Sequence, residues 1–234
     1  VDTPAWLRRT LIAAAVLVMV LLVVLPLLMV LLSAFGKGFA TWWGALTTPD
    51  AISALKLTLL TAAIVIPVNG VFGVIAAWAL TRFEFRGKRA VLALVDLPFA
   101  VSPVVAGLCL VLLFGSQGWF ADLLRAWDIK ILFARPGIVL ATLFITFPFV
   151  VRELVPLMQQ QGSEEEVVAR SLGAGAWTMF FRVTLPNIKW GLLYGVLLCG
   201  ARAMGEFGAV SVVSGHIRGL TNTLPLHIEI LYNE

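Results

Sequence analysis

The chain has 234 residues, of which 60% are hydrophobic and 13% charged, whereas about 25% of the residues of an ordinary soluble domain are charged. A surplus of apolar side chains this large cannot be buried in one water-soluble core, so the surrounding solvent must be lipid. The net charge of +4 is modest and its basic residues are scattered in short connections, which favours a membrane-surface role over nucleic-acid binding.

Five segments are long and apolar enough to cross a bilayer, which takes about 20 residues. They are residues 11–35, 57–81, 91–114, 137–158 and 188–213. The second and third segments contain prolines and glycines, which membrane helices tolerate because neighbouring helices satisfy the freed backbone groups. These residues favour kinked packing over a direct role in substrate binding.

The basic residues of the connections predict the orientation, because cytoplasmic loops are enriched in Lys and Arg. The short loop at residues 82–89 holds four basic residues and one Glu, so we place it, together with residues 1–10, in the cytoplasm. Five spans then put residues 214–234 on the outer side, as a segment that leads to a sixth span beyond this chain. The outer loops 36–56 and 115–136 contain Trp and Phe, which usually anchor short interfacial helices; an outer docking surface is the alternative.

The connection between the fourth and fifth spans has the pattern of two short helices. Ser163 and Glu166 form a capping box, and three successive glutamates suit the positive end of a helix dipole. A Gly-Ala-Gly run at residues 173–175 permits a sharp turn, and a second short helix then ends at Leu-Pro, residues 185–186. The apolar residues of these helices must be buried against either the chain's own membrane helices or a groove on a soluble partner.

This segment resembles the cytoplasmic signature of ABC importer permeases of the type-1, binding-protein-dependent family. In that signature an E-A-A run and a glycine are followed, ten residues later, by I-x-L-P. Val167 stands at the position of the family's glutamate, and Glu166 lies one residue earlier. In the family, the corresponding segment (residues 163–186 here) is a coupling helix that inserts into a cleft of the ATPase subunit. The resemblance therefore implies ATPase-coupling roles for Glu166, Ala169, Gly173, Ala174, Gly175, Leu185 and Pro186.

Two charged residues, Arg202 and Glu206, lie one helical turn apart in the fifth span, where each charge costs about 2.5–3.5 kcal/mol and marks a functional site by default. Their i,i+4 spacing allows them to pair, either as a lock between helices or as part of a translocation pathway. Residues 201–209 resemble the A-R-A-x-G-E-F-G-A motif of sulfate and molybdate permeases, which adds Gly205 and Gly208 to the candidate site.

Four further residues within the spans have weaker signals. Asp96 is placed to pair with a basic residue of another helix, and Arg152 is close enough to the cytoplasmic end of its span to snorkel. Cys109 and Cys199 lie in apolar runs and are expected to pack as free thiols rather than to form a disulfide or a metal site.

Residues 212–219 and 224–226 are similar to the CysW-type sulfate permease subunits, so the resemblance covers the second half of the chain. It implies an all-α, polytopic membrane helix bundle of the type-1 ABC importer kind, in a bacterial inner membrane. It further implies a non-catalytic subunit without its own cofactor, transporting sulfate or thiosulfate. The implied partners are a homologous second permease subunit, ABC ATPase subunits that bind ATP and Mg, and an external sulfate-binding protein. An importer of molybdate, tungstate or phosphate, and a channel or secondary transporter, are the alternatives.

Overall fold

The computed structural model describes residues 4–234, and within that range the chain is helical without a strand, as the composition predicts. It divides into two compact units, one extending to Ile52 and the other comprising Ser53–Glu234. The first unit contains α1 (Ala5–Met19), a π-helical turn (Val20–Val24), α2 (Leu25–Phe35) and the short helix α3 (Phe39–Leu46). From α1 to α2 the helix is continuous over 31 residues, and its apolar side chains are exposed, which suits lipid.

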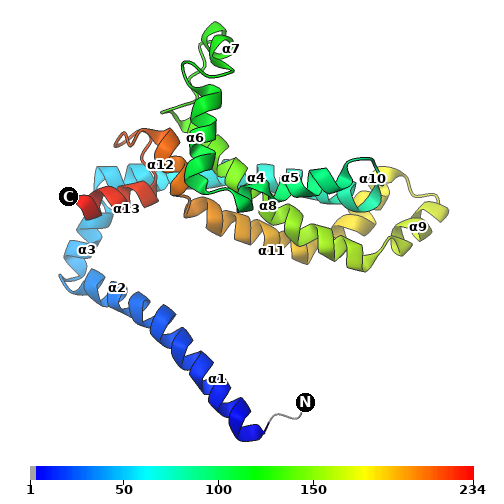
Figure 1. Cartoon of the computed structure of the whole chain (residues 1–234), viewed down its shortest axis with the longest axis horizontal. Coiled ribbons are helices and arrows are strands. Elements are labelled where there is room, and N and C mark those ends of the chain that lie inside the picture. Colours follow the sequence, from blue (N-terminus) through cyan, green and yellow to red (C-terminus); the bar gives the residue numbers. More distant parts are fainter. Residues whose placement is uncertain (1–3) are drawn as a thin grey trace. The chain divides into compact units, whose positions relative to one another are not determined.

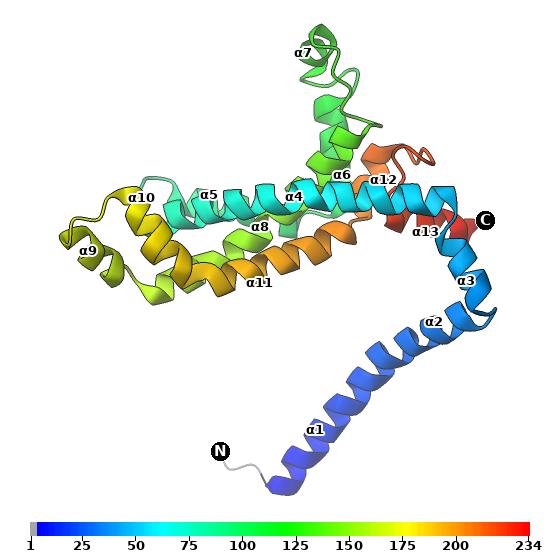
Figure 2. The same cartoon turned by 180° about the vertical axis from the view of Figure 1, so that it is seen from behind.

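Three long helices form the centre of the second unit. They are α4 (Pro49–Arg82, in this unit from Ser53), α8 (Arg135–Gln161) and α11 (Leu185–Met204), and they run side by side in Figures 1 and 2. Their shared core consists of small and branched apolar residues: Val65, Val74, Ala77, Val150, Leu154, Met158, Ile188, Cys199 and Ala203. Glycines allow the close approach, because a Cβ on Gly73 would lie 2.4 Å from Val150 Cγ1 and one on Gly195 would lie 3.2 Å from Val150 Cα.

The segment predicted as one span at residues 91–114 consists of two helices, α5 (Lys88–Ala100) and α6 (Pro103–Phe114), which meet at an angle of 109°. The bend at the prolines is thus a complete break between two helices. Val101 is extended, and Pro103 both disfavours helical geometry at Ser102 and lacks the N–H that a continuous helix would need. A short helix, α7 (Ala121–Ala126), follows α6, so both aromatic loops contain a short helix.

The sequence suggests that the second helix of the coupling segment ends at Leu185-Pro186, but it continues beyond them. Helix α10 (Ala176–Met179) passes through a π-helical turn (Phe180–Thr184) directly into α11. The amide of Leu185 bonds to the carbonyl of Phe180, five residues back, and this wider turn accommodates the ring of Pro186 within a continuous helix. Ala176 and Met204 therefore belong to one helical element.

The fifth predicted span also bends, by 49°, between α11 and α12 (Gly208–Ser214). Helix α12 packs on α6 at close range, because a Cβ on Gly107 would lie 2.8 Å from the carbonyl oxygen of Ala209. Residues 214–234, expected as an outer-side segment that leads to a further span, include a helix, α13 (Leu224–Asn233), in which Leu226 and His227 are buried.

Three helices of the described residues are long and apolar enough to span a membrane, and the number rises to five if each bent pair counts as one span. This agrees with the five spans predicted from the sequence. Helices α9 and α10 lie at one end of the α4–α8–α11 bundle, and α6, α12 and α13 lie toward the other (Figure 1).

Candidate functional site: the coupling segment and two ion pairs

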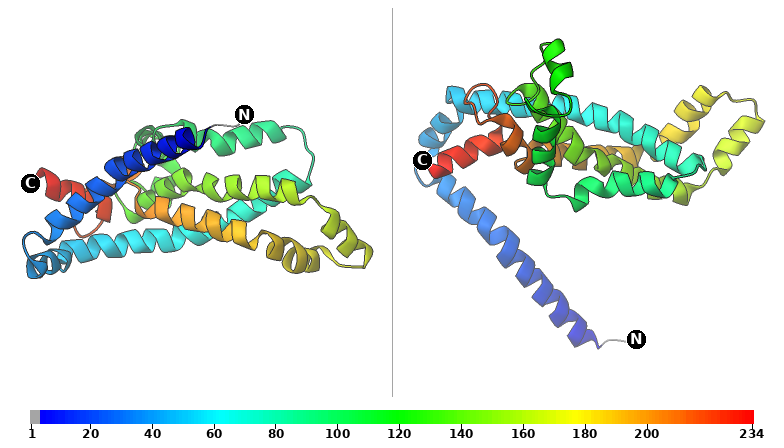
Figure 3. Two further views of the ribbon diagram at one scale, coloured as in Figure 1. Left: turned by 90° about the horizontal axis from the view of Figure 1, so that it is seen from below. Right: turned by 45° about the horizontal axis from the view of Figure 1, so that its top comes forward.

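Helix α9 (Glu164–Ser171) lies just beyond the end of α8, where Figure 3 shows it projecting from the bundle. Gly173 ends it with φ +87°, a left-handed conformation that strains any residue with a Cβ. The amide of Gly173 donates to the carbonyl of Arg170 and that of Ala174 to the carbonyl of Ala169, both at 3.0 Å. The turn predicted at residues 173–175 is thus present, and Gly173 is the residue that sets it.

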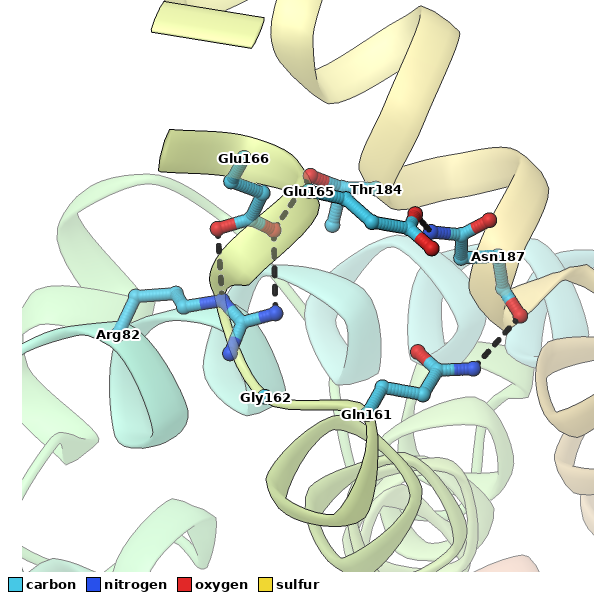
Figure 4. Close-up of a pocket in the computed structure, with 7 residues that line it drawn as sticks. All are labelled: Arg82, Gln161, Gly162, Glu165, Glu166, Thr184 and Asn187. Atoms are coloured by element: carbon cyan, nitrogen blue, oxygen red, sulfur yellow. Dashed lines mark hydrogen bonds and ion pairs between the residues drawn. The ribbon is translucent and has the colours of Figure 1, made fainter. Parts of the chain in front are cut away.

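Glu166 is held inside the bundle by a set of contacts that we call the Glu166 clasp, formed by Arg82, Glu166 and Thr184. The Arg82 guanidinium contacts both carboxylate oxygens, with Nε 2.8 Å from Oε2 and Nη2 3.1 Å from Oε1. Thr184 Oγ1 donates to Oε1 at 2.8 Å (Figure 4). The Arg82 and Glu166 side chains are 15% and 11% exposed. The clasp therefore ties α9 to the end of α4 and to the π turn that leads into α11.

The predicted capping box does not form. Ser163 occupies the N-cap position without a side-chain hydrogen bond to the helix, and the Glu166 carboxylate is turned to Arg82 instead of the helix N-terminus. The Arg82 guanidinium supplies an ion pair to both carboxylate oxygens and one charge-assisted hydrogen bond, which together outweigh a single bond to a backbone amide. From the sequence, Arg82 was used only to orient the 82–89 loop toward the cytoplasm, and Thr184 was not identified as a partner of Glu166. Neither residue lies near Glu166 in the sequence.

A hollow of about 330 Å³ adjoins the clasp (Figure 4). Asn187 spans it by donating to Glu165, and Gln161 Nε2 donates to the carbonyl of Asn187 at 3.0 Å. These bonds connect the end of α8 and the start of α9 to α11 at a second point, beside the clasp.

The opposite face of the coupling segment is uncovered. Leu172 is 83% and Trp177 77% exposed, and Val167 and Val168 are exposed as well. An open groove of about 490 Å³ lies beside them, lined by Glu164, Glu165, Val168, Ala169, Leu172, Arg182, Val183 and Asn187. The chain's own membrane helices thus bury Glu166 but leave this apolar face open within residues 4–234.

Arg202 and Glu206 pair as predicted, with Nη1 2.6 Å from Oε2, although Glu206 lies in the break after α11 rather than within the helix. Its other oxygen accepts the amide of Ala209, in the first turn of α12, at 2.9 Å. The Glu206 side chain is 1% exposed. Gly208 fits against Pro103 at the same bend, where a Cβ would lie 2.8 Å from the proline Cβ. Both oxygens of Glu206 are thus used to fix the bend, with Gly205 at the end of α11.

A second pair joins α5 to α8. Asp96 Oδ1 lies 3.3 Å from Arg152 Nε, which confirms the predicted pairing of Asp96 with a basic residue of another helix. The guanidinium also lies 4.8 Å from the centre of the Phe99 ring. Arg152 therefore points to α5 rather than snorkelling along its own helix. The two side chains are 55% and 57% exposed, far more than Glu206.

Comparison with known proteins decides which family has this arrangement. Residues 69–231 match the family described as "Binding-protein-dependent transport system inner membrane component". The sulfate transport system permease protein CysW of Synechocystis is 52% identical, over 96% of this chain and 82% of that protein. This chain belongs to the family of binding-protein-dependent transport system inner membrane components. It is a type-1 ABC importer permease close in sequence to CysW, and it is a multi-pass membrane protein.

The permease is also 52% identical to the chloroplastic sulfate permease 2 of Chlamydomonas reinhardtii, covering 98% of this chain but only 62% of that longer protein. Its fold is similar to that of a bacterial alginate ABC transporter solved in complex with an alginate pentasaccharide-bound periplasmic protein. The TM-score is 0.79, over 97% of this chain and 82% of that one. At 18% identity, this similarity concerns the fold alone.

Proposed function

We propose that this permease is the transmembrane subunit of an ATP-driven importer of sulfate or thiosulfate. The sequence identity to CysW carries the choice of substrate, since 52% identity extends over nearly the whole chain. The uncovered apolar face of α9 and α10 supports the coupling to a motor, because exposed apolar patches mark protein interfaces.

In this proposal the α9–α10 segment inserts into a cleft of a cytoplasmic ATPase subunit. That subunit binds ATP and Mg and hydrolyses the ATP, so the permease itself is not an enzyme. The loop at residues 82–89 and the N-terminus then face the cytosol. The turn at Gly173, Ala174 and Gly175 presents the exposed Leu172 and Trp177 as the docking surface. Ala169 lines the adjoining groove.

The geometry provides two routes for movement of the docked segment to reach the membrane helices. The first is the continuous helical element Ala176–Met204, about 43 Å long at 1.5 Å per residue, in which Leu185 and Pro186 are interior positions. The second is the Glu166 clasp, which joins α9 to α4. Glu166 thus serves the coupling by fixing α9 to the bundle, with its carboxylate turned away from the exposed face.

The complete importer would contain a homologous second permease subunit, two ATPase copies and an external sulfate-binding protein. Closure of the ATPase dimer on ATP draws the coupling segments together and opens the pathway outward. Hydrolysis returns it to the inward-open state. The Arg202–Glu206 pair, with Gly205 and Gly208, holds the bend between α11 and α12 through this cycle.

The proposal is tested by sulfate uptake into proteoliposomes that hold the complete importer and ATP. Sulfate uptake should require both ATP and the binding protein, and thiosulfate should compete better than molybdate or phosphate. Gly173→Leu should abolish uptake while membrane insertion stays intact, because a leucine is strained at φ +87°. Gly87→Leu is the matched control, since Gly87 has φ +91° and equal free space but lies outside the docking segment. ATP-independent uptake, or normal uptake by the Gly173 variant, would overturn the proposal.

A further inference from the structure

The two ion pairs of the membrane helices, Arg202–Glu206 and Arg152–Asp96, differ in whether they leave hydrogen-bonding groups free to bind a ligand. Glu206 is buried and both its oxygens have partners, so that pair belongs to the framework. Asp96 and Arg152 are each more than half exposed. Within residues 4–234, Asp96 is the one ion-pair partner of the Arg152 guanidinium, and their contact is through Nε. The two Nη groups, which carry four N–H donors, make no hydrogen bond in that range.

The position of the pair makes its exposure informative. Arg152 lies nine residues before the end of α8 at Gln161, and Asp96 eight residues after the start of α5 at Lys88. At 1.5 Å per residue both are about 12–14 Å from the helix ends that adjoin the coupling segment and the 82–89 loop. In the five-span topology both residues lie within a span, and charged groups there do not face lipid because their desolvation is too expensive. The open side of the pair therefore faces water or protein.

A small hollow of about 180 Å³ opens at the pair, with Asp96 and Arg152 as its charged residues and apolar side chains such as Leu92 and Val155 around them. A guanidinium with a free fork of donors in an apolar surround is the group that binds oxyanions best among protein side chains. The neighbouring Asp96 carboxylate repels an anion and so keeps its binding weak. A transport pathway needs this balance, since an ion that binds too tightly does not leave.

We propose that Arg152 is an anion contact on the translocation pathway, where a tetrahedral dianionic oxyanion binds the free face of its guanidinium. Asp96 is its counter-charge when the pathway is empty, and Phe99 holds the guanidinium plane. This assignment rests on the proposed function, which supplies the oxyanion as substrate.

The first test compares Arg152→Gln with Asp96→Asn in the complete importer in proteoliposomes. Loss of the guanidinium should lower sulfate uptake by about tenfold or more, the effect of removing a hydrogen bond to a charged group. Asp96→Asn keeps the anion contact and should retain most of the uptake. Arg125→Gln is the control, because Arg125 pairs with an exposed Asp122 outside the membrane helices. Equal losses in the Arg152 and Asp96 variants would instead indicate a purely structural pair and overturn the proposal.

The second test measures accessibility without measuring transport. Leu92→Cys, in the lining of the same hollow, keeps Arg152 in place, and in a Cys109→Ala background the buried Cys199 is the other thiol of this chain. A charged thiol reagent should modify the new cysteine in the assembled importer, and sulfate should slow the reaction relative to chloride at equal ionic strength. No modification in any nucleotide state, or equal rates in the two salts, would overturn the anion contact. Failure of the wild-type importer to take up sulfate would instead overturn the proposed function.

Discussion

The Glu166 clasp makes a prediction whose size follows from its contacts. Glu166→Ala removes a carboxylate that receives two nitrogens of Arg82 and the hydroxyl of Thr184. It leaves the Arg82 guanidinium with a long contact to the carbonyl of Met158, at 3.4 Å. The substitution therefore releases α9 from α4 and from the π turn in a single change.

The cost is worked from the burial of the pair. Removing one partner of a buried ion pair costs about 3–5 kcal/mol, and the residual exposure of 11–15% places this pair at the lower end. A value of about 3 kcal/mol corresponds to a shift of about 100-fold in the equilibrium between α9 held against α4 and α9 detached from it, since about 1.4 kcal/mol is tenfold. Thr184→Val removes one hydrogen bond to the carboxylate and should shift the equilibrium by roughly tenfold.

Amide hydrogen exchange of α9 in the purified complex measures this equilibrium directly. Exchange should accelerate by about 100-fold in Glu166→Ala and by roughly tenfold in Thr184→Val, and ATP hydrolysis should continue with little uptake. The control is Glu84→Gln, because Glu84 also pairs with a basic residue, Lys88, but is 88% exposed. Unchanged α9 exchange in Glu166→Ala, or equal acceleration in the Glu84 variant, would refute the reasoning.

Two further predictions concern the bend regions and use the melting temperature of the detergent-solubilised permease. Gly107→Ala should destabilise the permease by about 1–3 kcal/mol, because its methyl group would meet the Ala209 carbonyl at 2.8 Å. Gly44→Ala, with no atom within 4 Å, should leave the stability unchanged. Equal melting temperatures of the two variants would contradict the close packing of α6 on α12. Glu206→Ala should destabilise the permease by about 3 kcal/mol, because it leaves Arg202 unpaired. Glu206→Gln should cost less stability, because its amide oxygen still accepts the hydrogen bond of the Ala209 amide. Equal losses of stability in the two variants would show that this hydrogen bond contributes nothing.

The number of apolar spans could be predicted from the sequence, because apolar length alone determines which segments lipid accepts. The bends could not be predicted in the same way. Pro98 and Pro103 are both visible in the third span, yet the chain breaks only at the second, where Val101 turns extended. Conversely, Pro186 looked like the end of a helix and is interior to one, since a π turn absorbs it. Sequence patterns locate such residues, while packing decides their effect.

The candidate site shows the same division. The turn at Gly173 and the pairing of Arg202 with Glu206 follow from local spacing, so the sequence sufficed for both. The clasp joins Glu166 to Arg82, 84 residues away, and no local pattern relates the two. Arg152 and Asp96 were each noticed singly, but their shared exposure at the hollow emerges only from the packing of α5 on α8.

The central claim is that a separate ATP-hydrolysing subunit grips the α9–α10 segment. A photo-crosslinking amino acid at Leu172, which is 83% exposed beside Gly173, tests it in the assembled complex, with the 89% exposed Trp119 of the α6–α7 connection as control. The account predicts a crosslink from position 172 to the ATPase and none from position 119. A complex in which position 172 never crosslinks to the ATPase, or in which position 119 does so equally well, would contradict it.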